Sequence, residues 1–320
     1  MSDVETQIQM DRLALERRGR SPGSMASGSL ALALIAIVWG INFSVIKVGL
    51  DSLEPFAFNA LRFPIASLVL LIVLLARGQF GLPEREDFPR ILVLGLLGNV
   101  VYQVNFIIGI DRTLAGNASL LLATTPVWTA VLSAGVGHER LKGAFWLGLL
   151  GAIAGMVLVV IGNRTGLRLS GDTAAGDLLM VGASMVWAVY TVGSRDLIRR
   201  YGPLPLAAWT LWAGTAGLLV LGAPDLVSTD FSAVGAGAWI SVMYAGAFGI
   251  GIAYALWYYG VDVMGSARTA LYSNAVPVVA IVVAWIWLAE RPSWHQLVGA
   301  TLILGGITYA KRGAEALKAT

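Results

Sequence analysis

A small set of aromatic and amide side chains stands inside long apolar runs of this chain, where polar groups need partners. Tyr102, Gln103 and Phe106 occupy positions i, i+1 and i+4, which places them on one side of a helix. Rings and amides hold amphipathic molecules by contact and hydrogen bonding rather than by acid–base chemistry. The candidates of this kind are Trp39, Asn42, Tyr102, Gln103, Phe106, Trp187, Tyr190, Tyr254, Trp257 and Asn274. Each could line a cavity or simply pack between helices, and the two asparagines could bond to neighbouring helices.

Groups that perform catalysis are scarce. The chain has no Cys, and His138 and His295 lie in short polar breaks, so we expect no metal site, no cofactor and no catalytic residues. Glu139 and Glu290 are each followed by an Arg at the end of an apolar run, where pairing or anchoring is the simpler role. We expect no Asp or Glu deep within the apolar runs, which disfavours a strongly cationic ligand and proton exchange through a buried carboxylate.

Two arginines fall within apolar runs and could have a charge role. Arg268 is only a few residues into its run and could reach the interface. Arg62 lies about two helical turns into its run, where a charge is costly unless it is paired or hydrated. It could bind a carboxylate of a ligand, or it could have a structural or gating role.

The composition places these residues in an integral membrane protein. Hydrophobic residues make up 57% of the 320 residues, charged residues 13%, and the mean hydropathy is +0.74. Apolar runs long enough to cross a bilayer as helices recur throughout the chain. The sequence predicts an all-α fold with ten such segments, near 30–49, 56–76, 90–110, 115–137, 143–162, 177–194, 205–222, 236–260, 265–289 and 294–311.

Basic residues predict the orientation. With a cytoplasmic N-terminus, fifteen Lys and Arg fall in inner segments and four in outer loops. This asymmetry predicts that both termini are cytoplasmic. The basic residues are spread over many breaks, so we expect a lipid bilayer and a small-molecule solute as partners and no nucleic acid. Five tryptophans are expected at the membrane interfaces or in helix packing: Trp146, Trp239, Trp285, Trp287 and Trp294.

The chain repeats itself at an offset of 151 residues. The stretch "GIDRTLAGNASLLLATTPVW" around Pro126 corresponds to "GVDVMGSARTALYSNAVPVV" around Pro277, and many glycines pair at the same offset. Each proline removes a backbone donor and is expected to break its helix. Five segments per half means that the halves enter the membrane in opposite senses, an arrangement typical of transporters with alternating access.

The domains expected from this repeat are an N-terminal cytoplasmic tail (1–28), a first repeat (29–163), a second repeat (175–312) and a C-terminal cytoplasmic tail (313–320). Either Met1 or Met25 could be the start.

The sequence resembles the EamA branch of the drug/metabolite transporter superfamily. The resemblance rests on the Trp-Gly-x-Asn-Phe stretch at Trp39, on "FNALRFPIA", and on two prolines that are each followed by Glu thirteen residues later. It covers nearly everything after the tail. It implies ten helices around a central cavity, built mainly by the first, third, fourth, sixth, eighth and ninth segments. It also implies export of amino acids or related metabolites, as by the family's aromatic amino-acid exporters.

We therefore expect an exporter of a small amphipathic metabolite, an amino acid first, in a bacterial inner membrane, as a monomer or weak homodimer. A multidrug or nucleoside-type exporter of the same superfamily is the alternative. An intramembrane enzyme is disfavoured because no buried nucleophile and base are found, and a non-transporting membrane scaffold is a further alternative.

Overall fold

The computed structural model describes residues 22–137, 139–141, 143–162, 171–264 and 272–316, with some side chains left out. The first repeat contains α2 (Pro22–Leu50), α3 (Pro55–Ala76), α4 (Phe88–Leu96), η1 (Leu97–Val101), α5 (Tyr102–Arg112), α6 (Ala115–Leu122), α7 (Thr125–Gly135), β1 (Glu139–Leu141) and α8 (Gly143–Gly162). The second contains α9 (Gly171–Gly193), α10 (Arg195–Tyr201), α11 (Pro203–Ser228), α12 (Ala236–Met243), η2 (Tyr244–Ile252), α13 (Ala253–Met264), η3 (Ser273–Ala275), α15 (Val276–Leu288), α16 (Trp294–Gly313) and β2 (Ala314–Ala316).

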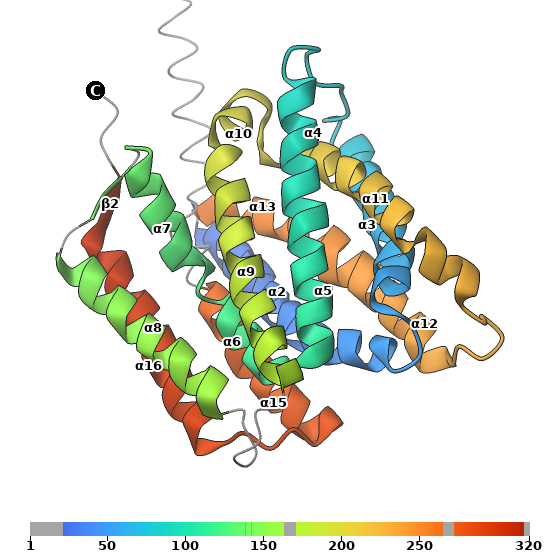
Figure 1. The fold of residues 1–320 in the computed structure, drawn as a ribbon. Helices are drawn as coiled ribbons and strands as arrows, with labels where there is room; N and C mark the ends of the chain where they lie inside the picture. The colour runs from blue at the N-terminus through green and yellow to red at the C-terminus, as the bar shows by residue number, and fades with distance from the viewer. Residues whose placement is uncertain (1–21, 138, 142, 163–170, 265–271, 317–320) are drawn as a thin grey trace, which may run out of the picture.

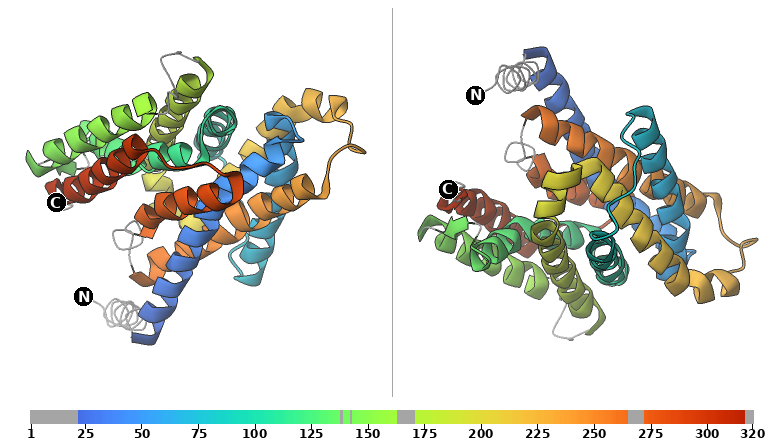
Figure 2. Two further views of the ribbon diagram at one scale, coloured as in Figure 1. Left: turned by 90° about the horizontal axis from the view of Figure 1, so that it is seen from below. Right: turned by 90° about the horizontal axis from the view of Figure 1, so that it is seen from above.

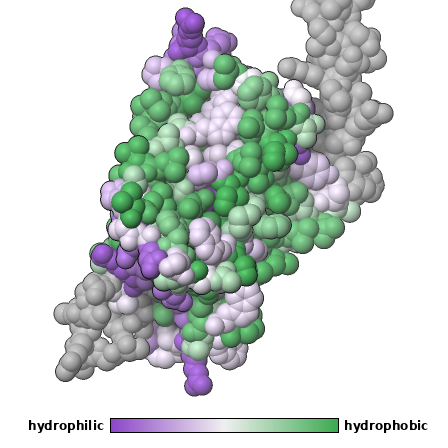
Figure 3. Space-filling view, turned by 90° about the vertical axis from the view of Figure 1, so that its right-hand side faces the viewer, coloured by the Kyte–Doolittle hydropathy of each residue, from purple (hydrophilic) through white to green (hydrophobic). Residues whose placement is uncertain are grey.

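Each of the ten predicted segments overlaps helical residues, and the chain is helical almost throughout its described part. Within the described residues, seven helical stretches are long and apolar enough to cross a membrane, and two shorter apolar helices are Gly143–Val159 and Val276–Trp287. In Figure 3, a broad hydrophobic surface lies between hydrophilic patches at the two ends of the molecule. The five tryptophans expected at the interfaces are all exposed. The fold is therefore that of a helical membrane protein.

The repeat is visible in the helix boundaries. The turns η1 and η2 are π-helical, and they end at Val101 and Ile252, which are 151 residues apart. The same offset relates α8 to α16 at both of their ends. Local geometry thus follows the repeated sequence, since matching residues begin and end matching helices.

The helices pair in a way that is preserved when the two halves are exchanged. The first helix of each half lies against the other half: α2 packs on α13 and α15, and α9 packs on α5 and α7. The remaining pairs are α3 with α11 and α8 with α16 (Figures 1 and 2). The interior is consequently formed by elements of both halves.

The pair of α8 and α16 approaches closely because small residues face each other. A Cβ on Gly155 would lie 2.7 Å from the carbonyl oxygen of Gly299, and one on Gly148 would lie 2.5 Å from that of Gly306. In membranes, helices associate through such close contacts between small residues. The glycines of the first repeat's last helix are thus used in packing within the chain.

Three details differ from the predicted segments. The helix α9 begins at Gly171, six residues before the predicted start, and α10 forms a separate short helix where a loop was expected. The strands β1 and β2 pair antiparallel, so a small ladder joins the ends of the two repeats in an otherwise helical fold. The helix α2 begins at Pro22, inside the predicted tail, and residues 1–21 lie outside the described part.

The molecule has two polar ends, the Arg200 end and the Glu290 end. The Arg200 end contains the start of α4, α10 and the β1–β2 pair, at the top of Figure 1. At this end Arg200 forms ion pairs with Glu84 and Asp87, and Arg90 pairs with Asp196. The Glu290 end contains the loop between α15 and α16 at the bottom of the same view.

Candidate functional site

A cavity of about 840 Å³ lies between the two repeats. Its wall is formed by α2, α3, α5, α6, α7, α9, α13 and α15, with smaller contributions from other elements. Nine of the ten ring and amide candidates line it: Trp39, Asn42, Tyr102, Gln103, Phe106, Trp187, Tyr190, Tyr254 and Trp257. The side chain of the tenth, Asn274, lies outside the described residues, as does Arg268. The periodicity that selected these residues thus brings most of them to one surface.

Aromatic rings form a continuous group in this wall. The ring of Trp187 lies 5.0 Å from those of Tyr102 and Tyr190 and 6.5 Å from that of Tyr254, measured between centroids. On the other side, the rings of Trp39 and Trp257 are 5.3 Å apart. Rings at these separations attract one another and offer flat apolar faces to a guest molecule.

Hydrogen bonds hold several of these rings in place. The Nε1 of Trp39 donates to the carbonyl oxygen of Gly249 at 2.9 Å, which ties α2 to η2. The hydroxyl groups of Tyr190 and Thr210 are 3.0 Å apart, which links α9 to α11. These contacts fix ring orientation, since a bonded indole or phenol loses rotational freedom.

Asn42 differs from its neighbours because its Oδ1 is buried and, among the described residues, has no hydrogen-bond partner. Asn42 lines the cavity, and its side chain lies close to Gly249 of the other repeat. A buried acceptor without a partner is unfavourable by about 1–3 kcal/mol. Asn42 is therefore a wall residue that carries a buried acceptor without a partner in the described structure.

The two prolines lie at helix starts in the wall. Pro126 is the second residue of α7, and α6 ends at Leu122, so the predicted segment 115–137 consists of two helices. The hydroxyl of Thr125 donates to the carbonyl oxygen of Leu122 at 2.7 Å and satisfies a group that the break leaves open. Pro277 is the second residue of α15, after the short 3₁₀ turn η3.

Arg62 also lines the cavity, and only 1% of its surface is exposed. It donates from Nε to Asn59 Oδ1 at 2.9 Å and from Nη2 to Gln103 Oε1 at 2.8 Å. Its guanidinium carbon lies 5.2 to 5.9 Å from the ring centroids of Phe58, Phe63 and Phe106. The structure thus places this charge in the wall.

One prediction about charge is wrong. Asp177 is completely buried, although the sequence indicated no carboxylate deep within an apolar run. The reason is that α9 begins at Gly171, which puts Asp177 more than one turn inside the helix rather than at its end. Asp177 accepts a hydrogen bond from the hydroxyl of Thr113 and is not among the residues that line the cavity.

The cavity extends towards the Arg200 end. Its wall continues to Thr191, Ser194, Ile198 and Pro203, at the junction of α9, α10 and α11. Thr191 and Ser194 fall at the end of the predicted segment 177–194, and the sequence shows Ile198 and Pro203 only as a break between apolar runs, because a short helix of seven residues leaves no clear periodic signal. These residues were therefore missed as part of the wall.

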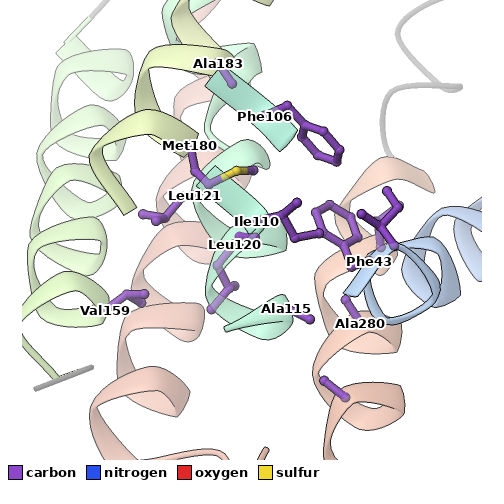
Figure 4. Close-up of a cluster of buried hydrophobic side chains, with 14 of the residues drawn as sticks. Phe43, Phe106, Ile110, Ala115, Leu120, Leu121, Val159, Met180, Ala183 and Ala280 are labelled. Carbon is purple, nitrogen blue, oxygen red and sulfur yellow. The ribbon is translucent and has the colours of Figure 1, made fainter. Parts of the chain in front are cut away.

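Packed side chains fill the space towards the Glu290 end. A buried cluster begins at Phe43 and Phe106 in the cavity wall and continues through Ile110 and Leu120 to Ala115, the first residue of α6 (Figure 4). Beyond it, the backbone N–H of Ala115 donates to Glu290 Oε1 at 3.2 Å. The cavity is thus closed on this side.

Polar contacts outside this cluster join the two repeats. Nε2 of Gln296, at the start of α16, donates to Oδ1 of Asn117 in α6 at 2.7 Å. Burial raises the pKa of Glu290 above its ordinary value, and the backbone N–H groups of Ala115 and Gly116 and the charge of Lys47 partly oppose this shift. The start of α6 is therefore held by the loop between α15 and α16.

Comparison with known proteins agrees with this architecture. The EamA-like transporter family matches residues 26–161 and 174–310. The chain is 30% identical to "Uncharacterized transporter YdfC" of Bacillus subtilis strain 168, over 90% of this chain and 91% of that protein. It is 33% identical to "Probable terminal-alkyne amino-acid exporter" of Streptantibioticus cattleyicolor, over 88% and 92%.

A "Probable amino-acid metabolite efflux pump" of Salmonella typhimurium is 27% identical, over 89% of this chain and 94% of that protein. One solved structure, described only as "Crystal structure of protein", matches 90% of this chain and 97% of its own with a TM-score of 0.64 and 24% identity, and so shows the shared fold. The resemblance inferred from the sequence is confirmed: the chain belongs to the EamA-like transporter family of membrane proteins.

Proposed function

We propose that this protein exports a small amphipathic metabolite, with an amino acid as the first candidate. The observation that carries the proposal is the cavity of about 840 Å³ between the repeats, walled by rings and amides and closed at the Glu290 end. Its volume suits a small organic solute. Two relatives support the same substrate class, one named "Probable terminal-alkyne amino-acid exporter" and the other "Probable amino-acid metabolite efflux pump".

The proposed architecture is ten transmembrane helices in two five-helix units of opposite orientation, residues 29–163 and 175–312. Support comes from the helix pairing, which is preserved when the halves are exchanged. Both termini and the Arg200 end face the cytoplasm of a bacterial cell, in agreement with the excess of basic residues on that side. The structure then corresponds to a state that is open inwards.

Transport follows by alternating access. Solute enters from the Arg200 end and rests among the rings of α5, α9 and α13. The packed cluster and the contacts between α6 and the α15–α16 loop then separate, while the Arg200 end closes. Two similar halves of opposite orientation can exchange two such arrangements.

The test is transport by purified protein in proteoliposomes. A metabolite panel is first screened for ligands that raise the unfolding temperature in detergent. The stabilising solutes are then tested for flux under imposed proton and sodium gradients. Flux of at least one solute, reduced in Trp187→Ala and Tyr254→Ala proteins that remain folded, supports the proposal. No flux of any stabilising solute would contradict it, and a non-transporting scaffold would show neither stabilisation nor flux.

A further inference from the structure

Arg62 is a buried charge whose partners in the described structure are neutral. Its two hydrogen-bonded acceptors are the amide oxygens of Asn59 and Gln103. An arginine has five N–H donors, and these two bonds leave others for a further acceptor. Among the described residues, no carboxylate forms an ion pair with Arg62.

The surrounding wall does not compensate this charge. Among the described residues, the side chains that line the cavity include no Asp, Glu, Lys or other Arg, so Arg62 gives this part of the wall a positive charge. A buried charge is stable when it is paired and hydrogen-bonded, and it is costly otherwise. An anion within the cavity would supply the missing partner.

The planar shape of the Arg62 guanidinium determines which kind of anion fits it best. A guanidinium presents paired N–H donors that match the two oxygens of a carboxylate. The amide of Gln103 lies beside it in the wall and holds one side of the guanidinium. From Phe106, which stacks near Arg62, a row of rings continues through Tyr102 to Trp187.

We propose that Arg62 binds a carboxylate of the transported solute, whose apolar part lies against the row Phe106, Tyr102 and Trp187. This inference rests on the proposed function and narrows its substrate class to organic carboxylates with an apolar body. An ammonium group is not required, because the described part of the wall offers no carboxylate to pair with one. Amino acids and simple monocarboxylates are therefore both substrates.

Four probes of similar size separate the contributions of charge: 3-phenylpropanoate, L-phenylalanine, 3-phenylpropanamide and 2-phenylethylamine. We expect the first two to raise the unfolding temperature of the detergent-purified protein, and the uncharged amide and the amine to have no effect at equal concentration. Inorganic phosphate tests whether an anion alone is enough, and we expect no stabilisation by it. Equal stabilisation by 3-phenylpropanamide, or stabilisation by phosphate alone, would overturn the proposal.

Variants assign the effect to Arg62. Arg62→Gln is expected to raise the dissociation constant for 3-phenylpropanoate by about tenfold or more, because the carboxylate loses at least one hydrogen bond to a charged donor. Gln103→Glu places a carboxylate beside Nη2 of Arg62 and is expected to abolish binding of the probe without removing the arginine. Asn105→Asp is its matched control, since Asn105 is on the same helix and does not line the cavity.

If Arg62→Gln does not fold, Gln103→Glu decides the question. Unchanged affinity for 3-phenylpropanoate in Gln103→Glu, or in a folded Arg62→Gln protein, would refute the assignment. Failure of this inference can be distinguished from failure of the proposed transport function. Carboxylate binding through Arg62 without flux contradicts transport alone, whereas flux that is independent of Arg62 contradicts this inference alone.

Discussion

The indole Nε1 of Trp39 donates a hydrogen bond of 2.9 Å to the carbonyl oxygen of Gly249, so the first helix of one repeat is bonded to the π-helical turn of the other. Both residues belong to the cavity wall. A π-helical turn has carbonyl groups out of the regular α-helical pattern, which makes them accessible to such donors. The bond connects the stability of the fold with the shape of the cavity.

Replacing Trp39 by Phe removes this bond and keeps an aromatic ring. We expect the free energy of unfolding in mixed micelles to fall by about 1–2 kcal/mol, the contribution of a hydrogen bond and some packing. Trp187→Phe is the control, since Trp187 makes ring contacts and, among the described residues, donates no indole hydrogen bond. An equal loss in the two variants would show that the bond to Gly249 is not the cause.

Gly155 allows α8 to approach α16, and its replacement by Ala is expected to destabilise the protein by roughly 1–3 kcal/mol. The added Cβ would lie 2.7 Å from the carbonyl oxygen of Gly299. Gly305→Ala provides the comparison, because among the described residues no atom of a neighbouring element lies within 4 Å of a Cβ at that position of α16. We expect Gly305→Ala to be neutral or slightly stabilising. Thermal unfolding in detergent measures both, and similar behaviour of the two would rule out close packing at Gly155.

Glu290 makes stability depend on pH. Burial raises its pKa in the folded protein above the ordinary value of 4.5, so the unfolded chain releases this proton at lower pH than the folded protein. The contribution of Glu290 to stability is therefore greatest below about pH 4.5 and is lost as the pH rises through the folded pKa. Glu290→Gln imitates the protonated form and should unfold at a higher temperature than the natural protein at pH 7.5.

The difference between the two proteins should shrink as the pH falls towards 4.5. Glu54→Gln, which removes an exposed carboxylate at the same end, is the control and should follow the natural protein throughout. A Glu290→Gln protein that is less stable at pH 7.5 would mean that the ionised carboxylate stabilises α6 through Ala115 more than burial disfavours it.

The absence of cysteine from the sequence allows orientation to be measured directly. Gln79 lies in the loop before α4 at the Arg200 end, and Ser232 lies in the loop between α11 and α12. Both are exposed. In intact cells we expect a membrane-impermeant maleimide to label Ser232→Cys, and to label Gln79→Cys only after permeabilisation. The reverse pattern would invert the proposed orientation.

The sequence alone determined that the chain is a helical membrane protein of a transporter family, that it contains a repeat, and which aromatic residues are candidates for the wall. Each of these depends on local properties: the length of an apolar run, the spacing of side chains around a helix, and the recurrence of glycines at one offset. Trp187 and Tyr254 could be selected in this way because periodicity places them on interior faces before any packing is known.

The tertiary structure decided the roles of the charged residues and the closure of the cavity, because these features depend on which helices pack against each other. Arg62 could be ligand-binding or structural from the sequence, and only the packing of α3 beside α5 placed it with Gln103 in the cavity wall. Asp177 is buried since α9 begins earlier than its hydropathy indicates. The Glu290 end is closed by side chains that are distant in the sequence, and the bond beyond them joins Ala115 to Glu290, 175 residues apart; no local pattern encodes such pairings.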